Sequence, residues 1–195
     1  MHVVTHFLRW SVGAAAAETQ TSVAERAALA RNAFARRTVV EIGVWHGVTT
    51  SLLKRSMDPS GVLYAVDPFP RGRLGICLHS VIAHREVART PGASVPWLRM
   101  TGQDAAARAA ARGDLRPDFV FIDGDHSYEG LRADWLGWSP LVTPGGMIAL
   151  HDSHATEACP IGDAGSVRFT EAHILSDPRY VLAEVVETLT LMRRQ

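Results

Sequence analysis

The chain has few of the features that mark specialised protein classes. It contains only two cysteines, Cys77 and Cys159, in 195 residues, which fit neither a disulfide framework nor a zinc cluster. Lys plus Arg and Asp plus Glu both number 20, so no basic field argues for a nucleic-acid partner. No apolar run approaches the roughly 20 residues of a membrane span. Residues 1–10 lack the basic start and long apolar stretch of a signal peptide. We therefore expect a cytoplasmic protein with no nucleic-acid or membrane partner.

Internal repeats and low-complexity linkers are also absent, so we expect one domain over residues 1–195, with an N-terminal helical segment at 1–36. Continuous apolar runs alternate with helical patterns, as is typical of strands buried on both faces of a parallel sheet. We predict strands near residues 38–43, 62–67, 96–100, 118–123, 147–151, 180–186 and 188–193. This alternation indicates an α/β, doubly wound, mostly parallel seven-stranded sheet with an antiparallel last strand.

Helices are expected between these strands. Ser22 and Glu25 have the spacing of a capping box and open a helix that runs to about residue 36. Further helices are predicted near residues 49–57, 76–88, 103–111, 128–139 and 167–176. Ligands of doubly wound sheets bind outside the carboxyl ends of the strands, where the strand order reverses. The polar residues at those ends are therefore the candidates for function.

An acidic residue and two glycines mark the end of the first predicted strand. These are Glu41, Gly43 and Gly47, and the small polar residue Thr49 follows at the start of the next helix. A glycine turn lets a ligand reach backbone N–H groups, because no Cβ stands in the way. The second strand ends on Asp67, and a carboxylate at that place accepts hydrogen bonds from two ribose hydroxyls in dinucleotide-binding folds. The pattern indicates a nucleoside-binding crevice, with an ordinary tight turn as the alternative.

The glycine spacing decides which nucleoside is expected. A dinucleotide fingerprint requires G-x-G-x-x-G, but Trp45 takes the place of the central glycine and no third glycine follows in register. The pattern E-x-G-x-x-x-G instead resembles motif I of the class I S-adenosylmethionine-dependent methyltransferases. In that family the turn faces the methionine moiety of the cofactor. The resemblance therefore implies that residues 41–47 and Thr49 lie along the methionine end, with Asp67 on the ribose.

Acidic residues and imidazoles also follow the fourth and fifth predicted strands. Asp123, Asp125 and His126 follow the fourth strand, and His151 and Asp152 follow the fifth. Neighbouring parallel strands lie about 4.8 Å apart, so Asp123, His151 and Asp152 can converge on one point. Clustered carboxylates repel one another and must be desolvated together, which a bound cation resolves. Oxygen ligands favour Mg²⁺ or Mn²⁺, whereas an imidazole also suits Zn²⁺ or Fe²⁺.

In combination these motifs resemble the cation-dependent O-methyltransferases, which include the catechol and caffeoyl-coenzyme A enzymes. The run D-G-D-H-S-Y-E-G is more similar to a bacterial branch that acts in antibiotic biosynthesis on hydroxyls of sugars and other small molecules. The resemblance covers residues 39–152 and implies a Rossmann-like methyltransferase sheet. It also implies S-adenosylmethionine as methyl donor and a metal ion, Mg²⁺ or Mn²⁺, on Asp123, His151 and Asp152. The family usually has a carboxylate at the place of His151.

The resemblance also implies further roles at the strand ends. Metal binding lowers the pKa of the acceptor hydroxyl and fixes its direction, and a neighbouring base then takes the proton. That base is Asp125 or His126, and we favour Asp125, because the sugar-modifying branch has an aspartate there. The family commonly places an adenine contact after the third strand, at Gln103 and Asp104, although a helix N-cap explains Asp104 equally well. Asp123 is expected to touch the cofactor as well as the metal.

Three functions fit these motifs. The first is a metal-assisted O-methyltransferase acting on a small-molecule substrate such as a sugar, a phenol or a natural product. The second is a metal-independent N- or O-methyltransferase, and the third is a non-catalytic cofactor-binding subunit. A scaffold has no need of costly clustered carboxylates, which disfavours the third function. His46 is expected either to pack within its turn or to contact the cofactor, and residues 69–75 to form a loop over the cofactor. A homo-oligomer is possible.

Overall fold

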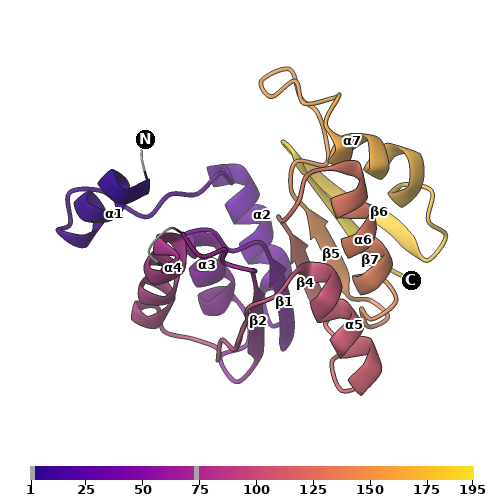
Figure 1. The fold of residues 1–195 in the computed structure, drawn as a ribbon. Helices are drawn as coiled ribbons and strands as arrows, with labels where there is room; N and C mark the ends of the chain where they lie inside the picture. The colour runs from indigo at the N-terminus through magenta and orange to yellow at the C-terminus, as the bar shows by residue number, and fades with distance from the viewer. Residues whose placement is uncertain (1–2, 73–74) are drawn as a thin grey trace.

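The structure, a computed structural model, describes residues 3–72 and 75–195. A seven-stranded sheet with the strand order β3-β2-β1-β4-β5-β7-β6 runs through the molecule and has helices on both faces (Figure 1). Strands β1 to β5 pair in parallel, whereas β7 pairs antiparallel with β5 and β6. The predicted fold class is therefore confirmed. The strands are β1 (Thr38–Ile42), β2 (Val62–Val66), β3 (Trp97–Leu98), β4 (Phe119–Ile122), β5 (Met147–Leu150), β6 (Tyr180–Val186) and β7 (Leu189–Arg194).

The helices occupy most of the predicted positions. In the described part of the chain they are α1 (Val3–Ser11), α2 (Val23–Ala33), α3 (Val48–Ser56), α4 (Leu78–Arg89), α5 (Gly102–Arg112), α6 (Tyr128–Trp138) and α7 (Gly165–Phe169), followed by a π-helical turn (Thr170–Ile174). The capping box of Ser22 and Glu25 is present at the start of α2. Sequence patterns thus located the helices through their caps and apolar spacing.

Several predicted boundaries are wrong. Helix α2 ends at Ala33 and not near residue 36, because Ala35 takes a positive φ of 60° that no α-helix can continue. The third strand has only two residues, Trp97 and Leu98, and not the predicted five. The helix predicted at 167–176 begins earlier, and its second half is the π-helical turn. The local sequence pattern did not signal these ends.

The continuous apolar runs arise because each face of the sheet has its own core. Phe119 and Phe121 of β4 join one buried cluster with residues of α2 and α3. Val120 and Ile122 of the same strand join the other cluster, with residues of α5 and α6. Successive side chains of a strand point to opposite faces, so a strand covered on both sides must be apolar throughout.

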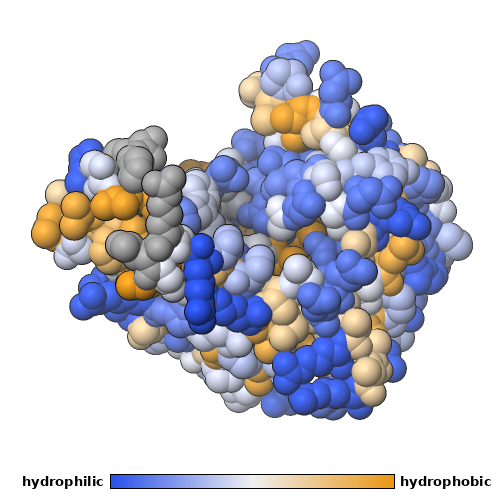
Figure 2. Space-filling model, in the orientation of Figure 1, coloured by the Kyte–Doolittle hydropathy of each residue, from blue (hydrophilic) through white to orange (hydrophobic). Residues whose placement is uncertain are grey.

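The N-terminal helix α1 lies apart from the sheet and beside α4 (Figure 1). The indole nitrogen of Trp10 donates to Glu86 of α4 at 2.8 Å, and Trp10 and His6 are buried. Leu8 of α1 and Val12, which follows the helix, are exposed apolar residues. Figure 2 shows apolar surface at the left, where α1 lies in Figure 1. Of the helices described, not one combines the length and the apolar character that crossing a bilayer requires.

Candidate active site

A cavity of about 700 Å³ opens at the carboxyl ends of the parallel strands. Its size is that of a typical small-molecule or cofactor site. The predicted site residues that line it come from the segments after β1, β2, β3 and β4, and are Gly43, Trp45, Asp67, Gln103, Asp123, Asp125 and His126. The other predicted site residues lie outside its lining, and are Glu41, Gly47, Thr49, Asp104, His151 and Asp152.

The two glycines of the turn after β1 serve different purposes. Gly43 has a φ of 86°, and a Cβ there would overlap the carbonyl oxygen of Asp123. Only glycine therefore lets the turns after β1 and β4 meet at the mouth of the cavity. Gly47 has a φ of 74° and lies against Ala83 of α4, where a Cβ would stand 3.0 Å from the Cα atom. Close packing of two helices thus explains Gly47 without a ligand.

Asp67 is fixed on the cavity wall by backbone donors. Its Oδ2 accepts a hydrogen bond from the Val44 amide at 3.0 Å, and its Oδ1 accepts one from the Phe69 amide at 2.6 Å. Each carboxylate oxygen has a second lone pair, so the group can still accept bonds from hydroxyls. The loop predicted to cover the cofactor at 69–75 includes residues 73 and 74, which lie outside the described residues.

Glu41 is completely buried beneath the turn. Burial raises the pKa of its carboxyl well above the usual value, and the nearby charges of Asp123 and Asp67 act in the same direction. Neither carboxyl oxygen has a hydrogen-bond partner among the described residues. The environment therefore favours an uncharged Glu41.

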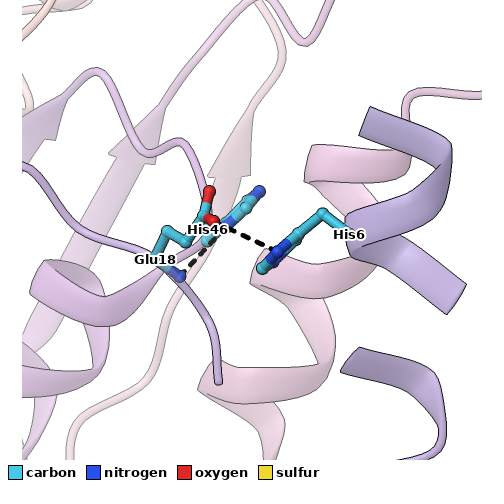
Figure 3. Close-up of side chains that lie close together, drawn as sticks. All are labelled: His6, Glu18 and His46. Atoms are coloured by element: carbon cyan, nitrogen blue, oxygen red, sulfur yellow. Dashed lines mark hydrogen bonds and ion pairs between the residues drawn. The ribbon is translucent and has the colours of Figure 1, made fainter. Parts of the chain in front are cut away.

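His46 of the same turn points away from the cavity toward the N-terminal segment. Its Nδ1 accepts a hydrogen bond from the Glu18 amide at 3.1 Å (Figure 3). Its Nε2 lies 2.8 Å from Nδ1 of His79. Burial lowers the pKa of His46 to about 4, helped by His79 and His6. Of the two roles considered for His46, packing within the turn fits these contacts better than a direct cofactor contact.

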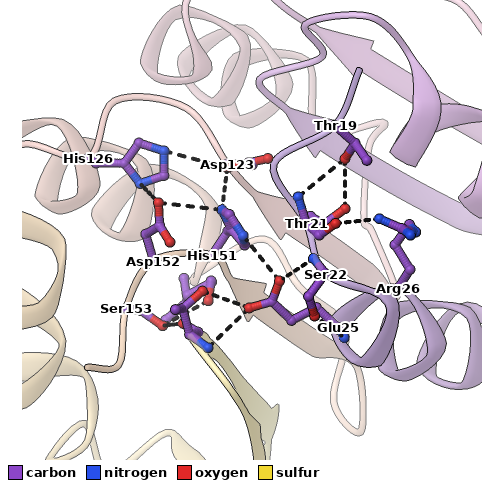
Figure 4. Close-up of polar contacts among 12 residues, drawn as sticks. Thr19, Thr21, Ser22, Glu25, Arg26, Asp123, His126, His151, Asp152 and Ser153 are labelled. Atoms are coloured by element: carbon purple, nitrogen blue, oxygen red, sulfur yellow. Dashed lines mark hydrogen bonds and ion pairs between the residues drawn. The ribbon is translucent and has the colours of Figure 1, made fainter. Parts of the chain in front are cut away.

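Four side chains after β4 and β5 converge in an acidic cluster (Figure 4), and they are Asp123, His126, His151 and Asp152. Asp123 and His126 of this cluster line the cavity. Asp123 Oδ1 lies 2.8 Å from His151 Nδ1 and 3.5 Å from His126 Nε2. Asp152 Oδ2 lies 3.7 Å from His151 Nδ1 and 3.8 Å from His126 Nδ1. Ligand atoms of Asp123, His126 and His151 all lie within 4.8 Å of one another. This donor set of carboxylate oxygens and imidazole nitrogens fits a divalent transition-metal ion.

The backbone at this cluster is strained at one position. Asp152 has a φ of 48°, which a residue with a side chain adopts only when its surroundings hold it there. The side chain of Ser166 donates to the Asp152 carbonyl at 2.5 Å. Helix α7 therefore helps to hold the turn that carries Asp152 toward His126 and His151.

The buried carboxylate Glu25 completes the cluster from behind and was missed in the sequence as a site residue. Its Oε2 lies 3.4 Å from His151 Nε2 and accepts from the Ser22 amide at 2.8 Å. Its Oε1 accepts from the Thr188 amide at 3.0 Å and the Thr188 hydroxyl at 2.7 Å. Glu25 thus orients the His151 ring, as carboxylates behind metal-binding histidines do. The capping box located Glu25, but nothing in the pattern revealed this second contact.

Pairing with carboxylates changes the acidity of the two histidines. Burial opposes protonation of His151, but its contacts with Asp123 and Glu25 outweigh burial and raise the pKa to about 10. The hydrogen bond to Asp123 raises the pKa of His126 despite partial burial. Burial works against ionisation of Asp123, but the two imidazoles lower its pKa below the usual value. A metal ion that binds through His151 Nδ1 must therefore displace a proton.

Asp134 of α6 is a second residue that sequence reasoning missed. It lines the cavity and is only 6% exposed, and a Cβ on Gly102 would overlap its carboxyl oxygen. Burial raises the pKa of Asp134 to about 7, with a further contribution from Asp125. A carboxyl with that pKa either donates or accepts a hydrogen bond near neutral pH. Its place in the helix, among apolar neighbours, gave no sequence signal.

Asp125 lies at the junction between the cavity and the start of α6. Its Oδ1 accepts from the Ser127 amide at 2.9 Å, and Ser127 caps the helix by accepting from the Gly130 amide at 3.0 Å. The close approach of Gly130 to the Asp125 side chain leaves no space for a Cβ. The carboxylate is therefore held in one orientation at the cavity wall.

A family model for a methyltransferase domain matches residues 40–153, which is more than half of the chain. The protein belongs to this methyltransferase family. The matched segment begins in β1 and ends just after Asp152, so it contains both the glycine turn and the acidic cluster. A search of curated proteins gave no significant match.

The methyltransferase is also similar to solved structures. An O-methyltransferase from Bacillus cereus in complex with SAH is 18% identical, with a TM-score of 0.66, over 100% of this chain and 91% of that chain. TomG, an O-methyltransferase from Streptomyces achromogenes involved in tomaymycin synthesis and solved with SAM, is 16% identical, with a TM-score of 0.69, over 100% and 90%. MycE, solved with Mg, SAH and mycinamycin VI, is 18% identical, with a TM-score of 0.54, over 81% and 44%. This likeness confirms the predicted fold, that of the class I S-adenosylmethionine-dependent methyltransferases.

Proposed function

We propose that the protein transfers a methyl group from S-adenosylmethionine to a hydroxyl of a small molecule, with a divalent metal ion at the acidic cluster. The observation that carries the proposal is the place of Asp123. This residue lines the cavity and also lies within 3.5 Å of both His126 and His151. A cofactor in the cavity therefore has a potential metal site at its edge, where an acceptor hydroxyl would be held.

The cavity residues suggest how the cofactor is oriented. Asp67 would accept hydrogen bonds from the ribose hydroxyls, and the turn at Gly43 and Trp45 would face the methionine end. Gln103 and Asp134 would contact the adenine end. Four further residues were predicted to contact the cofactor but do not line the cavity, and they are Glu41, Gly47, Thr49 and Asp104. Their contacts with the cofactor stay predictions. The SAM and SAH bound in the solved relatives support the choice of cofactor.

Asp123, Asp152 and His151 would hold the metal, as predicted, and the geometry adds His126 as a neighbour. An ion bound there would lower the pKa of an acceptor hydroxyl and fix its direction. Two nearby imidazoles favour Mn²⁺ or a softer ion over Mg²⁺. The Mg in the MycE structure supports a metal in this fold. The mycinamycin VI bound to MycE and the part that TomG takes in tomaymycin synthesis support a natural-product substrate.

We retain Asp125 as the favoured base. Its carboxylate is held by the Ser127 amide, and the residue lines the cavity. His126 has a raised pKa because of its bond to Asp123, so without a metal ion it is more often protonated and less able to take a proton. Asp125 would accept the hydroxyl proton as the acceptor oxygen attacks the sulfonium methyl in line.

One observation favours a second candidate, a methyltransferase that uses no metal. The His151 imidazole is already flanked by Asp123 at 2.8 Å and Glu25 at 3.4 Å. This arrangement satisfies the buried charges without an ion. His151 would then act as a protonated group that orients Asp123, and Asp125 or His126 would be the sole base.

Methyl transfer from labelled S-adenosylmethionine to a panel of phenols, catechols and sugar hydroxyls separates the two candidates. The assay is run in EDTA and again after Mg²⁺ or Mn²⁺ is restored. If a metal ion assists the transfer, activity should disappear in EDTA and return when the ion is restored. The Asp123→Ala variant should be inactive both in EDTA and after the ion is restored. Full activity in EDTA would exclude metal assistance and leave the metal-free candidate.

A further inference from the structure

A second cluster of potential metal ligands lies on the far side of the glycine turn from the acidic cluster. It consists of His6 from α1, Glu18 from the segment between α1 and α2, and His46 from the turn (Figure 3). His79 of α4 lies beside them and lines the cavity. His6 and His46 are only 5% and 2% exposed, whereas Glu18 reaches the surface. None of these residues belongs to the proposed catalytic machinery.

The three side chains present their donor atoms at metal-binding separations. His6 Nδ1 lies 3.1 Å from Glu18 Oε1, and one ligand atom from each of the three residues lies within 4.8 Å of the others. The His46 Nε2 contact with His79 Nδ1, at 2.8 Å, orients the ring so that the His46 Nδ1 faces Glu18. Metal-binding histidines are commonly oriented through their second nitrogen in this way.

The imidazole of His6 is buried, and its ring nitrogens lack hydrogen-bond partners among the described residues. Neither of its ring nitrogens makes a hydrogen bond within the described residues, although Nδ1 is close to the Glu18 carboxylate. A buried imidazole without partners is costly. Its ring stacks on that of His46, with centroids 5.0 Å apart and planes 9° from parallel. An ion shared with Glu18 and His46 would satisfy this nitrogen.

We propose that His6, Glu18 and His46 bind a Zn²⁺ ion, with His79 orienting His46. Two imidazoles and one carboxylate are a ligand set that zinc accepts at about 2.0–2.2 Å in a tetrahedral site, whereas Mg²⁺ disfavours imidazole. Binding requires the His6 ring to turn out of its stack and Nδ1 of His46 to exchange the Glu18 amide for the ion. Glu18 is exposed enough to follow.

The ion would fasten the N-terminal segment to the cofactor turn. Trp45, next to His46, lines the cavity, and so does Gln20, two residues after Glu18. Helix α1 also packs against α4, where Trp10 bonds to Glu86. Zinc at this cluster would therefore order the segment that closes one side of the cavity, and would tighten cofactor binding without touching the reacting atoms.

Calorimetric titration of the metal-free protein with Zn²⁺ tests the site. The background is the double variant Asp123→Asn, Asp152→Asn, which removes the two aspartates of the acidic cluster and keeps the outcome independent of the proposed reaction. We expect one zinc ion to bind, and His6→Gln or His46→Gln in that background to weaken binding at least 100-fold. His84→Gln, an exposed histidine of α4, is the matched control and should leave binding unchanged.

Two further readouts keep the test decisive. Co²⁺ at a four-coordinate, histidine-containing site should give intense visible absorption, which His6→Gln should remove. Hydrogen exchange of the α1 amides should slow at least tenfold when zinc is added. Without zinc, exchange of the sheet amides in His6→Gln should match that of the background variant, which shows that a loss of zinc binding is not a loss of fold. Absence of zinc binding in the background variant would overturn the proposal. So would zinc affinities of the His6→Gln and His46→Gln variants equal to that of the background variant.

Discussion

The Glu25 carboxylate and the His151 imidazole form a buried pair, with Oε2 3.4 Å from Nε2. Glu25 belongs to the capping box of α2, and His151 follows β5 at the acidic cluster. The same carboxylate therefore caps a helix, bonds to Thr188 before β7 and orients the histidine that faces Asp123. Helix α2 is thereby linked to the candidate metal site.

Glu25→Gln tests this link. We expect the variant to fold, to lose about 2 kcal/mol or more of unfolding free energy, and to lose about tenfold or more in metal affinity. The His151 pKa should fall from its raised value, because one of its two carboxylate partners is gone. Denaturant unfolding, metal titration and NMR titration of the imidazole measure the three effects.

Glu129→Gln is the matched control for Glu25→Gln, since Glu129 is exposed and its ion-pair partner among the described residues is Arg132 of α6. It should change unfolding free energy by less than about 1 kcal/mol. An unshifted His151 pKa in Glu25→Gln would show that the buried pair does not hold the imidazole.

The stability of the metal-free protein should depend on pH through His151. Its folded-state pKa is raised to about 10, so its contribution is complete below the unfolded value near 6.5 and is lost as pH rises toward 10. The difference in unfolding free energy between wild type and His151→Asn should shrink by at most roughly 1.4 kcal/mol per pH unit in that window. Chemical denaturation at pH 6, 8 and 9.5 measures it, and a constant difference would contradict the protonated state.

Asp134→Asn should stabilise the protein and weaken cofactor binding. The raised pKa of Asp134, about 7, means that ionisation costs stability as pH rises from the unfolded value near 4 through 7. At pH 8 the variant should gain on the order of 2 kcal/mol after allowance for water in the cavity, and almost nothing at pH 4. Affinity for S-adenosylhomocysteine should fall about tenfold if Asp134 contacts the adenine. Unaltered affinity would remove Asp134 from the cofactor site.

Asp67→Ala should lower affinity for S-adenosylhomocysteine at least tenfold, because the two charge-assisted hydrogen bonds that we propose to the ribose would be lost. Asp104→Ala is the informative comparison. Its side chain accepts from the Thr101 hydroxyl at 2.8 Å at the start of α5, outside the cavity lining. Calorimetry should therefore show little change for Asp104→Ala, and equal losses in both variants would place Asp104 on the cofactor.

The sequence predicted the parts of the site that depend on local pattern. The apolar strands located the sheet, and Asp67, Asp123 and His126 followed because strand ends meet at one edge of a parallel sheet. Gly43 was predicted from its turn, and the structure adds its contact with the Asp123 carbonyl. These features lie within a few residues of a strand end, where periodicity is informative.

Other parts depend on contacts between distant segments. Glu25 and Asp134 lie inside helices whose pattern records a cap or an apolar face, and their second roles come from tertiary packing. His6 gave no sequence signal, because its contact with Glu18 requires α1 to fold back beside α4. The periodicity of a single sequence does not reveal contacts between segments that are far apart in the chain.

Anomalous diffraction from Mn²⁺-soaked crystals tests the central claim most directly, because it needs no knowledge of the acceptor. We expect a manganese peak between Asp123 and Asp152, with His151 or His126 nearby, and we expect the peak to disappear in Asp123→Ala. Absence of a peak there, in crystals where S-adenosylhomocysteine occupies the cavity, would contradict a metal-assisted transfer.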